Sequence, residues 1–192
     1  MCVELGTEHR APSTAHYNEP VSELSEFRRA KDDFFANHPQ SPLTPEQRRG
    51  FRGLKYYDEN PALAVVVEPE LFESPELVDM QTSTGDSAPY LRWARVRFEV
   101  EGQPAELTVY RDPVSGDLFL PFQDVNAGGE TYGAGRYLEV EELPDGRLLL
   151  DFNYAYNPYC AYNDAWSCPL PPPENRLRVA IRAGERSFDD GQ

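Results

Sequence analysis

The stretch LRWARVRFEV (91–100), followed closely by AELTVYR (105–111), predicts the fold class of this chain. Four apolar residues of the first segment alternate with charged ones: Ala94, Val96, Phe98 and Val100. This period of two is typical of a strand with one buried face. Leu91 and Trp93 have the opposite phase, so we expect either a β-bulge or a strand that is buried on both faces.

Six further segments carry strand patterns: 62–67, 76–83, 118–122, 135–142, 148–156 and 176–182. Glycine and proline, 13 and 18 of the 192 residues, fall mostly between these segments, as expected for tight turns. Asp145-Gly146 predicts a hairpin turn. Eight short strands at this spacing predict a mainly β fold, an antiparallel β-barrel or sandwich.

The N-terminal part of the chain has a different pattern. Residues 1–19 are polar and patternless, and we expect a flexible tail. SELSEFRRAKDDFFANHP, from Ser22, predicts a helix. One stripe of this helix contains Leu24, Phe27, Lys31 and Phe34, with Phe35 beside it. We expect the stem of Lys31 to lie along the stripe with its ammonium group in water.

A second short helix is predicted at TPEQRRGF, where Thr44 and Gln47 form a capping box. The expected organisation is therefore one globular domain, 20–192. It comprises an N-terminal helical segment, 20–55, packed against a β region, 56–192.

The charge of the chain excludes several partners. Asp and Glu number 33 against 18 Lys and Arg, a net charge of −15. Neither nucleic acid nor an anionic membrane is an expected partner, because both attract basic surfaces. Only Lys31 and Lys55 are lysines. Acidity with so few lysines favours a halophilic protein, although a GC-rich genome that prefers arginine codons would give a similar composition.

No apolar run reaches the length of a membrane helix, and the first twenty residues lack the apolar core of a signal peptide. We therefore predict a cytoplasmic protein with reduced thiols.

The unusual stretch DFNYAYNPYCAYNDAWSC (151–168) concentrates tyrosine and asparagine. At its start, Asp151 and Asn153 would face away from the core if the strand 148–156 continued regularly. Residues 153–175 then leave the sheet, and we expect them to form a cover. The rings either supply the core of this cover or roof a pocket that binds a neutral, hydrogen-bonding ligand.

Several motifs resemble, in order and spacing, the bacterial and archaeal family called domain of unknown function 1684. They are KDDFFANHPQSPL, FRGLKYY, FLPFQDVNAGGETYGAGRYLEV and DFNYAYNPYCAYNDAWSCPLPPPENRLRVAIRAGE. The resemblance covers about residues 24–188, and its most specific parts are 128–136 and 151–185. The family has no settled activity, so the resemblance indicates where a site lies and implies no reaction.

The residues exclude several chemistries in the β region. His9, His16 and His38 all precede it, and no lysine follows Lys55. A Ser-His-Asp triad, a histidine-ligated metal or a Schiff-base lysine within 56–192 would need help from the N-terminal segment. The glycine-rich run 128–136 is either an anion nest beside its arginine or a turn in which that arginine pairs with a carboxylate.

Cys160 and Cys168 predict a disulfide or a pair of buried, neighbouring thiols, and no metal. No cofactor is predicted, and the sequence does not determine an oligomeric state.

The candidate ligand-binding residues lie in the two specific runs and near them: Asp124, Glu130, Tyr132, Arg136, Asp151, Asn153, Tyr156, Asn157, Glu174 and Asn175. We expect the runs 128–136 and 151–174 to meet in space. The favoured interpretation is a module that binds a neutral or weakly anionic small molecule. The alternatives are a hydrolase that uses two carboxylates, as glycosidases do, and a purely structural or interaction protein.

Overall fold

The computed structural model describes residues 22–188, and the predicted tail 1–19 lies outside this range. The described chain begins with α1 (Glu23–Asn37) and α2 (Pro45–Gly50). The strands follow in the order β1 (Ala64–Val67), β2 (Glu70–Gln81), β3 (Ser87–Val100), β4 (Gln103–Arg111), β5 (Leu118–Phe122), β6 (Arg136–Glu139), β7 (Glu141–Glu142) and β8 (Leu148–Asp151). Four short 3-10 turns, η1 (Pro61–Leu63), η2 (Phe152–Tyr154), η3 (Tyr159–Ala161) and η4 (Pro173–Asn175), lie in the connections.

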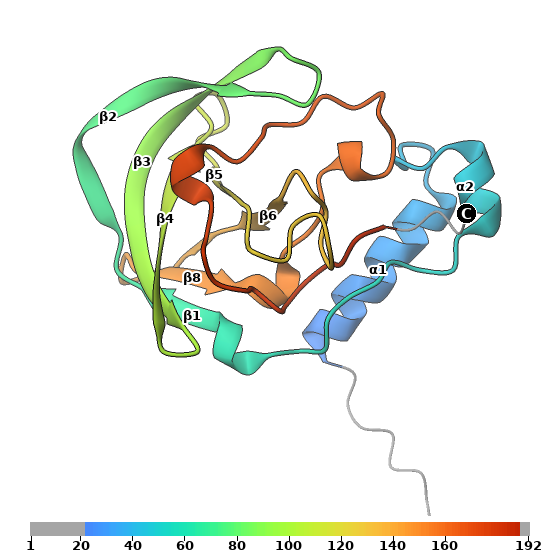
Figure 1. Ribbon diagram of the computed structural model, residues 1–192, viewed down its shortest axis with the longest axis horizontal. Coiled ribbons are helices and arrows are strands. Elements are labelled where there is room, and N and C mark those ends of the chain that lie inside the picture. The colour runs from blue at the N-terminus through green and yellow to red at the C-terminus, as the bar shows by residue number, and fades with distance from the viewer. Residues whose placement is uncertain (1–21, 189–192) are drawn as a thin grey trace, which may run out of the picture.

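The strands form two antiparallel sheets. One has the order β2-β3-β4-β5-β6 and the other the order β1-β8-β7. In Figure 1, β2 and β3 form a long curved hairpin on one side, α1 lies on the opposite side, and the chain after β8 runs between them. The mainly β class and the N-terminal helix are confirmed. Across residues 22–188 neither sheet closes on itself, so the barrel alternative is not confirmed.

Strand β3 contains the predicted bulge. Its register against β4 shifts between Arg92 and Ala94, which turns the earlier part of the strand over. Ala94 and Val96 then face the core and are fully buried. The change of phase in the sequence therefore marks a bulge and not a strand buried on both faces.

The main core is built from both sheets and from the last part of the chain. Fully buried members include Val96 and Leu107 from the large sheet, Leu148 and Leu150 from the small sheet, and Ile181. Each such side chain contributes about 1.5–3 kcal/mol when it leaves water. The core thus depends on the C-terminal segment as well as on the strands.

The predicted strand at 176–182 is wrong, although its inward face is right. Leu177, Val179 and Ile181 are buried, but the segment forms only one isolated parallel bridge to the chain after β5. The N–H of Leu177 donates to the carbonyl of Gln123 at 2.7 Å, and the N–H of Val125 donates to that of Val179 at 3.4 Å. Side chains bind the next part of the segment. The N–H of Ile181 donates to Asp124 Oδ2 at 2.7 Å, and its carbonyl accepts from Arg136 at 2.8 Å.

The predicted strand at 148–156 ends early. Its regular part stops at Asp151, whose carboxylate accepts the N–H of Asn153 at 3.0 Å and begins the turn η2. Because the period changes there, the outward direction expected from a regular strand does not apply to Asn153, which is buried. Its amide binds the backbone of Asn60, donating to the carbonyl at 3.0 Å and accepting the N–H at 2.7 Å.

Both helices begin as the sequence predicts. Ser22 accepts the N–H of Ser25, and Thr44 and Gln47 form a complete capping box. Phe35 of α1 packs edge-on against Tyr162, with ring centroids 4.9 Å apart. The rings of the cover 153–175 therefore supply a small core together with α1, as the first interpretation of that stretch expects.

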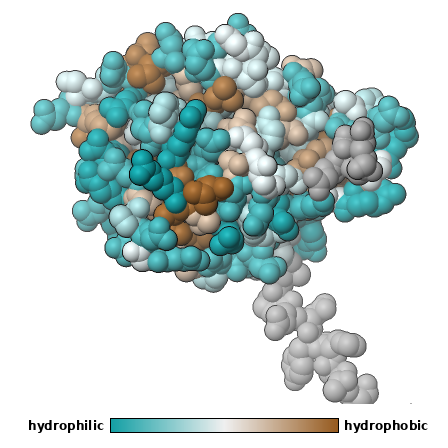
Figure 2. Space-filling view, in the orientation of Figure 1, coloured by the Kyte–Doolittle hydropathy of each residue, from teal (hydrophilic) through white to brown (hydrophobic). Residues whose placement is uncertain are grey.

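The face drawn in Figure 2 is mainly hydrophilic, with apolar side chains in small separate groups. Within the described residues, no helix has both the length and the apolar character needed to cross a bilayer.

Candidate functional site

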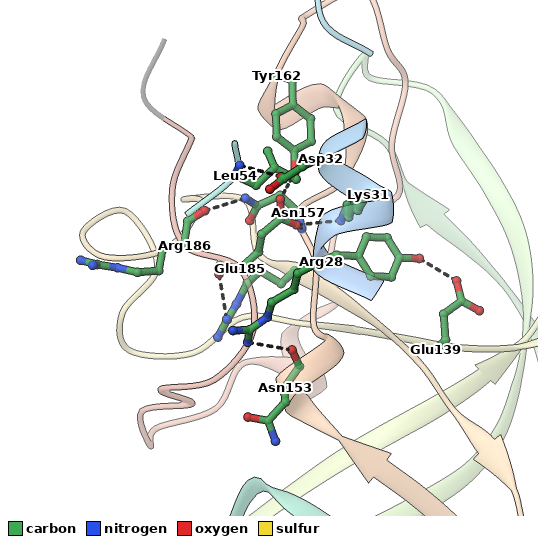
Figure 3. A network of polar contacts seen from close by, with 12 residues as sticks. Arg28, Lys31, Asp32, Leu54, Glu139, Asn153, Asn157, Tyr162, Glu185 and Arg186 are labelled. Carbon is green, nitrogen blue, oxygen red and sulfur yellow. Dashed lines mark hydrogen bonds and ion pairs between the residues drawn. The ribbon is translucent and has the colours of Figure 1, made fainter. Parts of the chain in front are cut away.

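Glu185 is the centre of a buried polar network beside α1. One carboxylate oxygen accepts from Lys31 Nζ at 3.0 Å and from the backbone N–H of Asn157 at 2.8 Å. The other oxygen accepts from the hydroxyl of Tyr162. Figure 3 shows these side chains converging from the helix, the cover and the C-terminal segment. Burial, followed by the nearby Glu185 charge, raises the pKa of Tyr162 well above its usual value, so the phenol remains a donor.

A second buried pair holds the backbone that carries Glu185. The guanidinium of Arg136 donates to the carbonyls of Ala183, at 2.5 Å, and Glu185, at 3.0 Å. It also lies 3.6 Å from Asp124, and both side chains are almost completely buried. Burial lowers the pKa of Arg136, while Asp124 opposes this effect by stabilising the cation. Arg136 thus fixes the position of the segment from which Glu185 projects.

Helix α1 is anchored by three polar side chains within about one turn. Arg28 donates to the carbonyl of Asn153 at 3.5 Å, Lys31 binds Glu185, and Asp32 accepts the N–H of Leu54 at 2.9 Å. Burial raises the pKa of Asp32, although the bond from Leu54 works in the opposite direction. These contacts attach α1 to three different segments of the chain.

A groove of about 700 Å³ lies between α1 and the strands β6, β7 and β8. Its aromatic walls are Phe27, Phe34, Phe35, Tyr154, Tyr156 and Tyr159. Four carboxylates also line it: Glu23, Glu139, Glu141 and Asp151. Lys31 is the lining cation, and its Nζ lies 4.9 Å from the ring centre of Tyr156 and 5.6 Å from that of Phe35. The groove is therefore aromatic, acidic and open to solvent on one side.

Two of the groove's polar groups already have partners. The hydroxyl of Tyr156 donates to Glu139 at 2.8 Å. Burial, together with the Glu139 charge, raises the pKa of Tyr156 and keeps the phenol neutral. Asp151 accepts the side-chain amide of Asn153 at 2.8 Å as well as its N–H. These bonds hold the two side chains in fixed positions along the groove.

The comparisons with known proteins bear on this arrangement. Residues 49–186 match the family described as "Protein of unknown function (DUF1684)". The chain belongs to the DUF1684 family. A similar solved structure is the solution NMR structure of an uncharacterized protein from Haloarcula marismortui, 44% identical in sequence. The match covers 85% of this chain and 91% of that chain, with a TM-score of 0.66. No curated protein matches the chain.

The two specific runs of this DUF1684 protein meet, as predicted. Tyr137 and Tyr156 exchange backbone hydrogen bonds of 2.8 and 2.9 Å. Arg136 donates to the backbone carbonyl of Glu185, and the backbone N–H of Asn157 donates to the carboxylate of Glu185. Gly135 makes the close approach possible. Its φ is +99°, and a Cβ there would lie 2.7 Å from Cγ of Pro171 in the run 151–174 and 2.6 Å from the carbonyl oxygen of Phe122.

Of the ten candidate ligand-binding residues, Asp151 and Tyr156 line the groove. Asp124, Arg136, Asn153 and Asn157 are buried and bind the backbone around it. Asn157 is held by a bond from its amide nitrogen to the carbonyl of Arg186 at 2.8 Å, and its side-chain oxygen is buried without a hydrogen-bond partner. These four residues support the site, and their predicted contact with a ligand stays a prediction.

Four candidates lie elsewhere. Asn175 is fully buried and joins β4 to β5, since its amide donates to Thr108 and Pro121 at 2.8 and 2.7 Å. Its neighbour Glu174 accepts from Arg92 at 3.0 Å and from Tyr110 at 2.8 Å. Burial opposes ionisation of Glu174, but these bonds lower its pKa below the usual value.

The other two lie on the glycine-rich turn before β6. Glu130 is exposed and accepts the hydroxyl of Tyr57 at 3.0 Å. Tyr132 lies beside Cys160, with its hydroxyl 3.4 Å from the carbonyl oxygen and 3.7 Å from the sulfur.

Sequence reasoning missed the contribution of α1 to the groove. Phe27, Lys31 and Phe34 were assigned to one helical stripe, but as residues that pack and not as the wall of a site. The expectation that the Lys31 ammonium lies in water is wrong, because it binds Glu185 and the side chain is only 15% exposed. The signal available in the sequence was the cation itself, which interrupts an otherwise apolar stripe.

Cys160 and Cys168 are both buried and carry free thiols. Among residues 22–188, no three His, Cys, Asp or Glu side chains are grouped closely enough to hold a metal ion.

Proposed function

We propose that this protein binds a small molecule in the groove between α1 and the small sheet. The ligand has an apolar or aromatic body and a positively charged or hydrogen-bond-donating group. The observation that carries the proposal is the combination of aromatic walls with four carboxylates in one groove of about 700 Å³. Small-molecule sites are concave, mostly apolar, and contain a few polar groups that orient the ligand.

The aromatic walls supply the surface for the ligand body. Phe27 and Tyr154 pack edge-to-face with centroids 5.0 Å apart, and Phe27 remains 39% exposed. An exposed phenylalanine beside a tyrosine offers an apolar surface that gains free energy when a ligand covers it. Rings of this kind also attract cations through their negative faces.

The charge of the groove favours a cation over an anion. Lys31 is paired with Glu185, so the pair adds little net charge. The carboxylates of Glu139, Glu141 and Asp151 then determine the sign of the potential, together with that of Glu23. Since like charges repel inside a partly desolvated groove, an anionic ligand is disfavoured there. The proposed partner is therefore neutral or cationic and not weakly anionic.

The hydrolase alternative receives less support from the geometry. Of the five carboxylates in the specific sequence runs and near them, only Asp151 lines the groove: Asp124, Glu130, Asp151, Glu174 and Glu185. Glu185 is buried behind Lys31, and Glu174 is bound by Arg92 and Tyr110. Glycosidic chemistry needs two carboxylates on opposite sides of the same substrate bond. A binding site is thus the function that this groove supports best.

Nuclear magnetic resonance titration with three related probes tests the proposal. The probes are benzyltrimethylammonium, benzyl alcohol and benzenesulfonate, which share a ring and differ in charge. We expect the cation to shift the amide signals of α1 and of residues 139–159 in a saturable way. The neutral probe should bind more weakly, and the sulfonate should cause no saturable shift.

Two variant pairs locate the binding. Phe27→Ala and Glu141→Gln change the groove, while Leu77→Ala and Glu76→Gln change exposed residues of β2 as matched controls. Loss of an aromatic contact worth about 1.4 kcal/mol weakens binding about tenfold. We expect that loss for Phe27→Ala, a smaller one for Glu141→Gln, and none for the controls. Equal binding of the sulfonate and the cation, or equal effects of Phe27→Ala and Leu77→Ala, would contradict the proposal.

A further inference from the structure

Cys160 and Cys168 lie side by side on the cover, and neither of them lines the groove. Cys160 belongs to η3, and Cys168 follows in an extended segment that bonds to the β2–β3 turn. The backbone N–H of Cys160 donates to Cys168 Sγ at 3.2 Å. Both side chains are buried in one cluster with Tyr137, and both thiols are free. The pair is therefore placed so that a small movement would join the two sulfurs.

Hydrogen-bond donors surround the sulfur of Cys160. The neighbouring side chain of Cys168 is the main reason why the pKa of Cys160 is lowered. The hydroxyl of Tyr132, 3.7 Å away, and that of Ser83 act in the same direction, while burial acts against them. The pKa of Cys168 is raised, mainly because its proton is held by Cys160. The two thiols are thus unequal, and Cys160 is the one that ionises first.

Cys160 also lies at the edge of a hollow on the surface. It lines a surface hollow of about 350 Å³ together with Gln47, Asn163, Asp164 and Phe188. Cys168 is not part of the lining of this hollow. A small polar reagent that enters the hollow therefore lies next to Cys160 and not next to Cys168.

We propose that Cys160 and Cys168 form a reversible redox site, in which Cys160 reacts with a hydroperoxide and Cys168 resolves the product as a disulfide. In the first step, the thiolate of Cys160 attacks one oxygen of the O–O bond. An S–O bond forms, the O–O bond breaks, and the leaving alkoxide or hydroxide takes up a proton. Cys160 becomes a sulfenic acid and the peroxide is reduced to an alcohol or to water.

In the second step, the sulfur of Cys168 attacks the sulfur of the Cys160 sulfenic acid. The S–S bond forms, the S–O bond breaks, and water leaves with the proton of Cys168. The two thiols have then given two electrons to the peroxide. A dithiol reductant returns the site to its starting state by thiol–disulfide exchange.

Oxidation would fix the part of the cover between the two cysteines. Tyr159 and Trp166 pack edge-on there, with centroids 5.0 Å apart. The N–H of Ser83 donates to the carbonyl of Cys168 at 2.8 Å, which connects this segment to the β2–β3 turn. The disulfide would therefore join η3 covalently to the segment at Cys168, which is hydrogen-bonded to the tip of the β2–β3 hairpin.

The test uses the full chain with Cys2→Ser, so that two thiols remain, and hydrogen peroxide as the probe. We expect stoichiometric peroxide to convert both thiols to one intramolecular disulfide, identified by peptide mapping and reversed by dithiothreitol. In the Cys168→Ala protein, dimedone should label Cys160 after peroxide treatment. In the Cys160→Ala protein, Cys168 should remain unlabelled.

The pH profile of iodoacetamide labelling separates a reactive thiol from a merely buried one. Labelling of Cys160 in the unoxidised protein should reach half its maximum rate at a pH below that of an unperturbed cysteine, about 8.5. Tyr132→Phe should move this midpoint upward. The control variant Tyr90→Phe, at a ring that stacks on Phe119, should not move it. Folding of each variant is checked by its amide spectrum. Peroxide reaction no faster than that of a free thiol, or equal labelling of the two cysteines, would overturn the proposal.

Discussion

The Nζ atom of Lys31 lies 3.0 Å from Oε2 of Glu185, a residue 154 positions later in the chain. Lys31 belongs to α1, and Glu185 follows the last buried segment of the core. Their contact attaches the helix to the β region through a carboxylate that is only 1% exposed. The same ammonium group forms part of the groove wall. This ion pair therefore contributes both to the attachment of the helix and to the shape of the groove.

Replacing Lys31 by methionine should destabilise the protein by about 3 kcal/mol, since removing one partner leaves a buried charge uncompensated. The measurement is the free energy of unfolding in urea. Arg49→Met is the control, because Arg49 and Glu46 form an exposed pair whose loss costs at most about 0.5 kcal/mol. Equal changes in the two variants would show that the Lys31–Glu185 pair does not anchor α1.

Replacing Arg136 by lysine should be nearly as disruptive as removing the side chain. A lysine retains the charge but has no planar fork to reach the carbonyls of Ile181, Ala183 and Glu185 together. We expect a loss of about 3 kcal/mol or more, because buried carbonyls would lose their donors. In the same urea experiment, Arg97→Lys on the exposed face of β3 should have a small effect. A mild Arg136→Lys phenotype would mean that the C-terminal segment holds itself in place.

Stability should fall steeply above about pH 10, where tyrosines in an unfolded chain begin to ionise. Burial raises the pKa of Tyr110, Tyr137 and Tyr162 in the folded protein. The folded state therefore keeps protons that the unfolded state loses, and stability present below pH 10 disappears as the pH rises. Urea unfolding at several pH values between about 9 and 11 measures how steeply the free energy of unfolding falls.

Tyr162→Phe should remove about one proton from the difference between the folded and unfolded states. The slope of the free energy of unfolding should then become shallower by about 1.4 kcal/mol per pH unit. An unchanged slope, or a spectrum in which most of the 11 tyrosines titrate before unfolding, would contradict the burial of these phenols.

The melting temperature should rise with potassium chloride concentration. A net charge of −15 repels itself at low salt, and the screening length falls from about 10 Å at 0.1 M to about 3 Å at 1 M. Scanning calorimetry over this range, with potassium sulfate at equal ionic strength as a second salt, checks the prediction. A flat or falling melting temperature would remove the halophilic interpretation of the composition.

Local patterns of the sequence predicted much of the fold. The alternation in 91–100, including its change of phase, specifies β3 and its bulge, and Thr44 with Gln47 specifies the start of α2. Such features depend on neighbours in the chain. The segment 176–182 shows the limit of this reasoning. Its alternation is that of a strand, yet it makes only a few backbone bonds to residues 123–125. The side chains of Asp124 and Arg136 bind the rest of it, which no periodicity reveals.

The candidate site was predicted only in part, because its walls come from distant parts of the chain. Asp151 and Tyr156 were identified within a conspicuous stretch, and they do line the groove. Lys31 and Phe27 were not, since a helical stripe of this kind usually packs against a core. With 33 carboxylates in the chain, the sequence gives no means of choosing Glu185 as the partner of Lys31.

The position of a bound probe in the groove tests the central claim most directly. Intermolecular nuclear Overhauser effects between benzyltrimethylammonium and the isotope-labelled protein report which side chains lie beside the ligand. The account predicts contacts from the probe's ring to Phe27 and Tyr154 and from its methyl groups to Tyr156. Contacts confined to other surfaces, or none at a concentration that saturates the amide shifts, would contradict the assignment of the groove as the binding site.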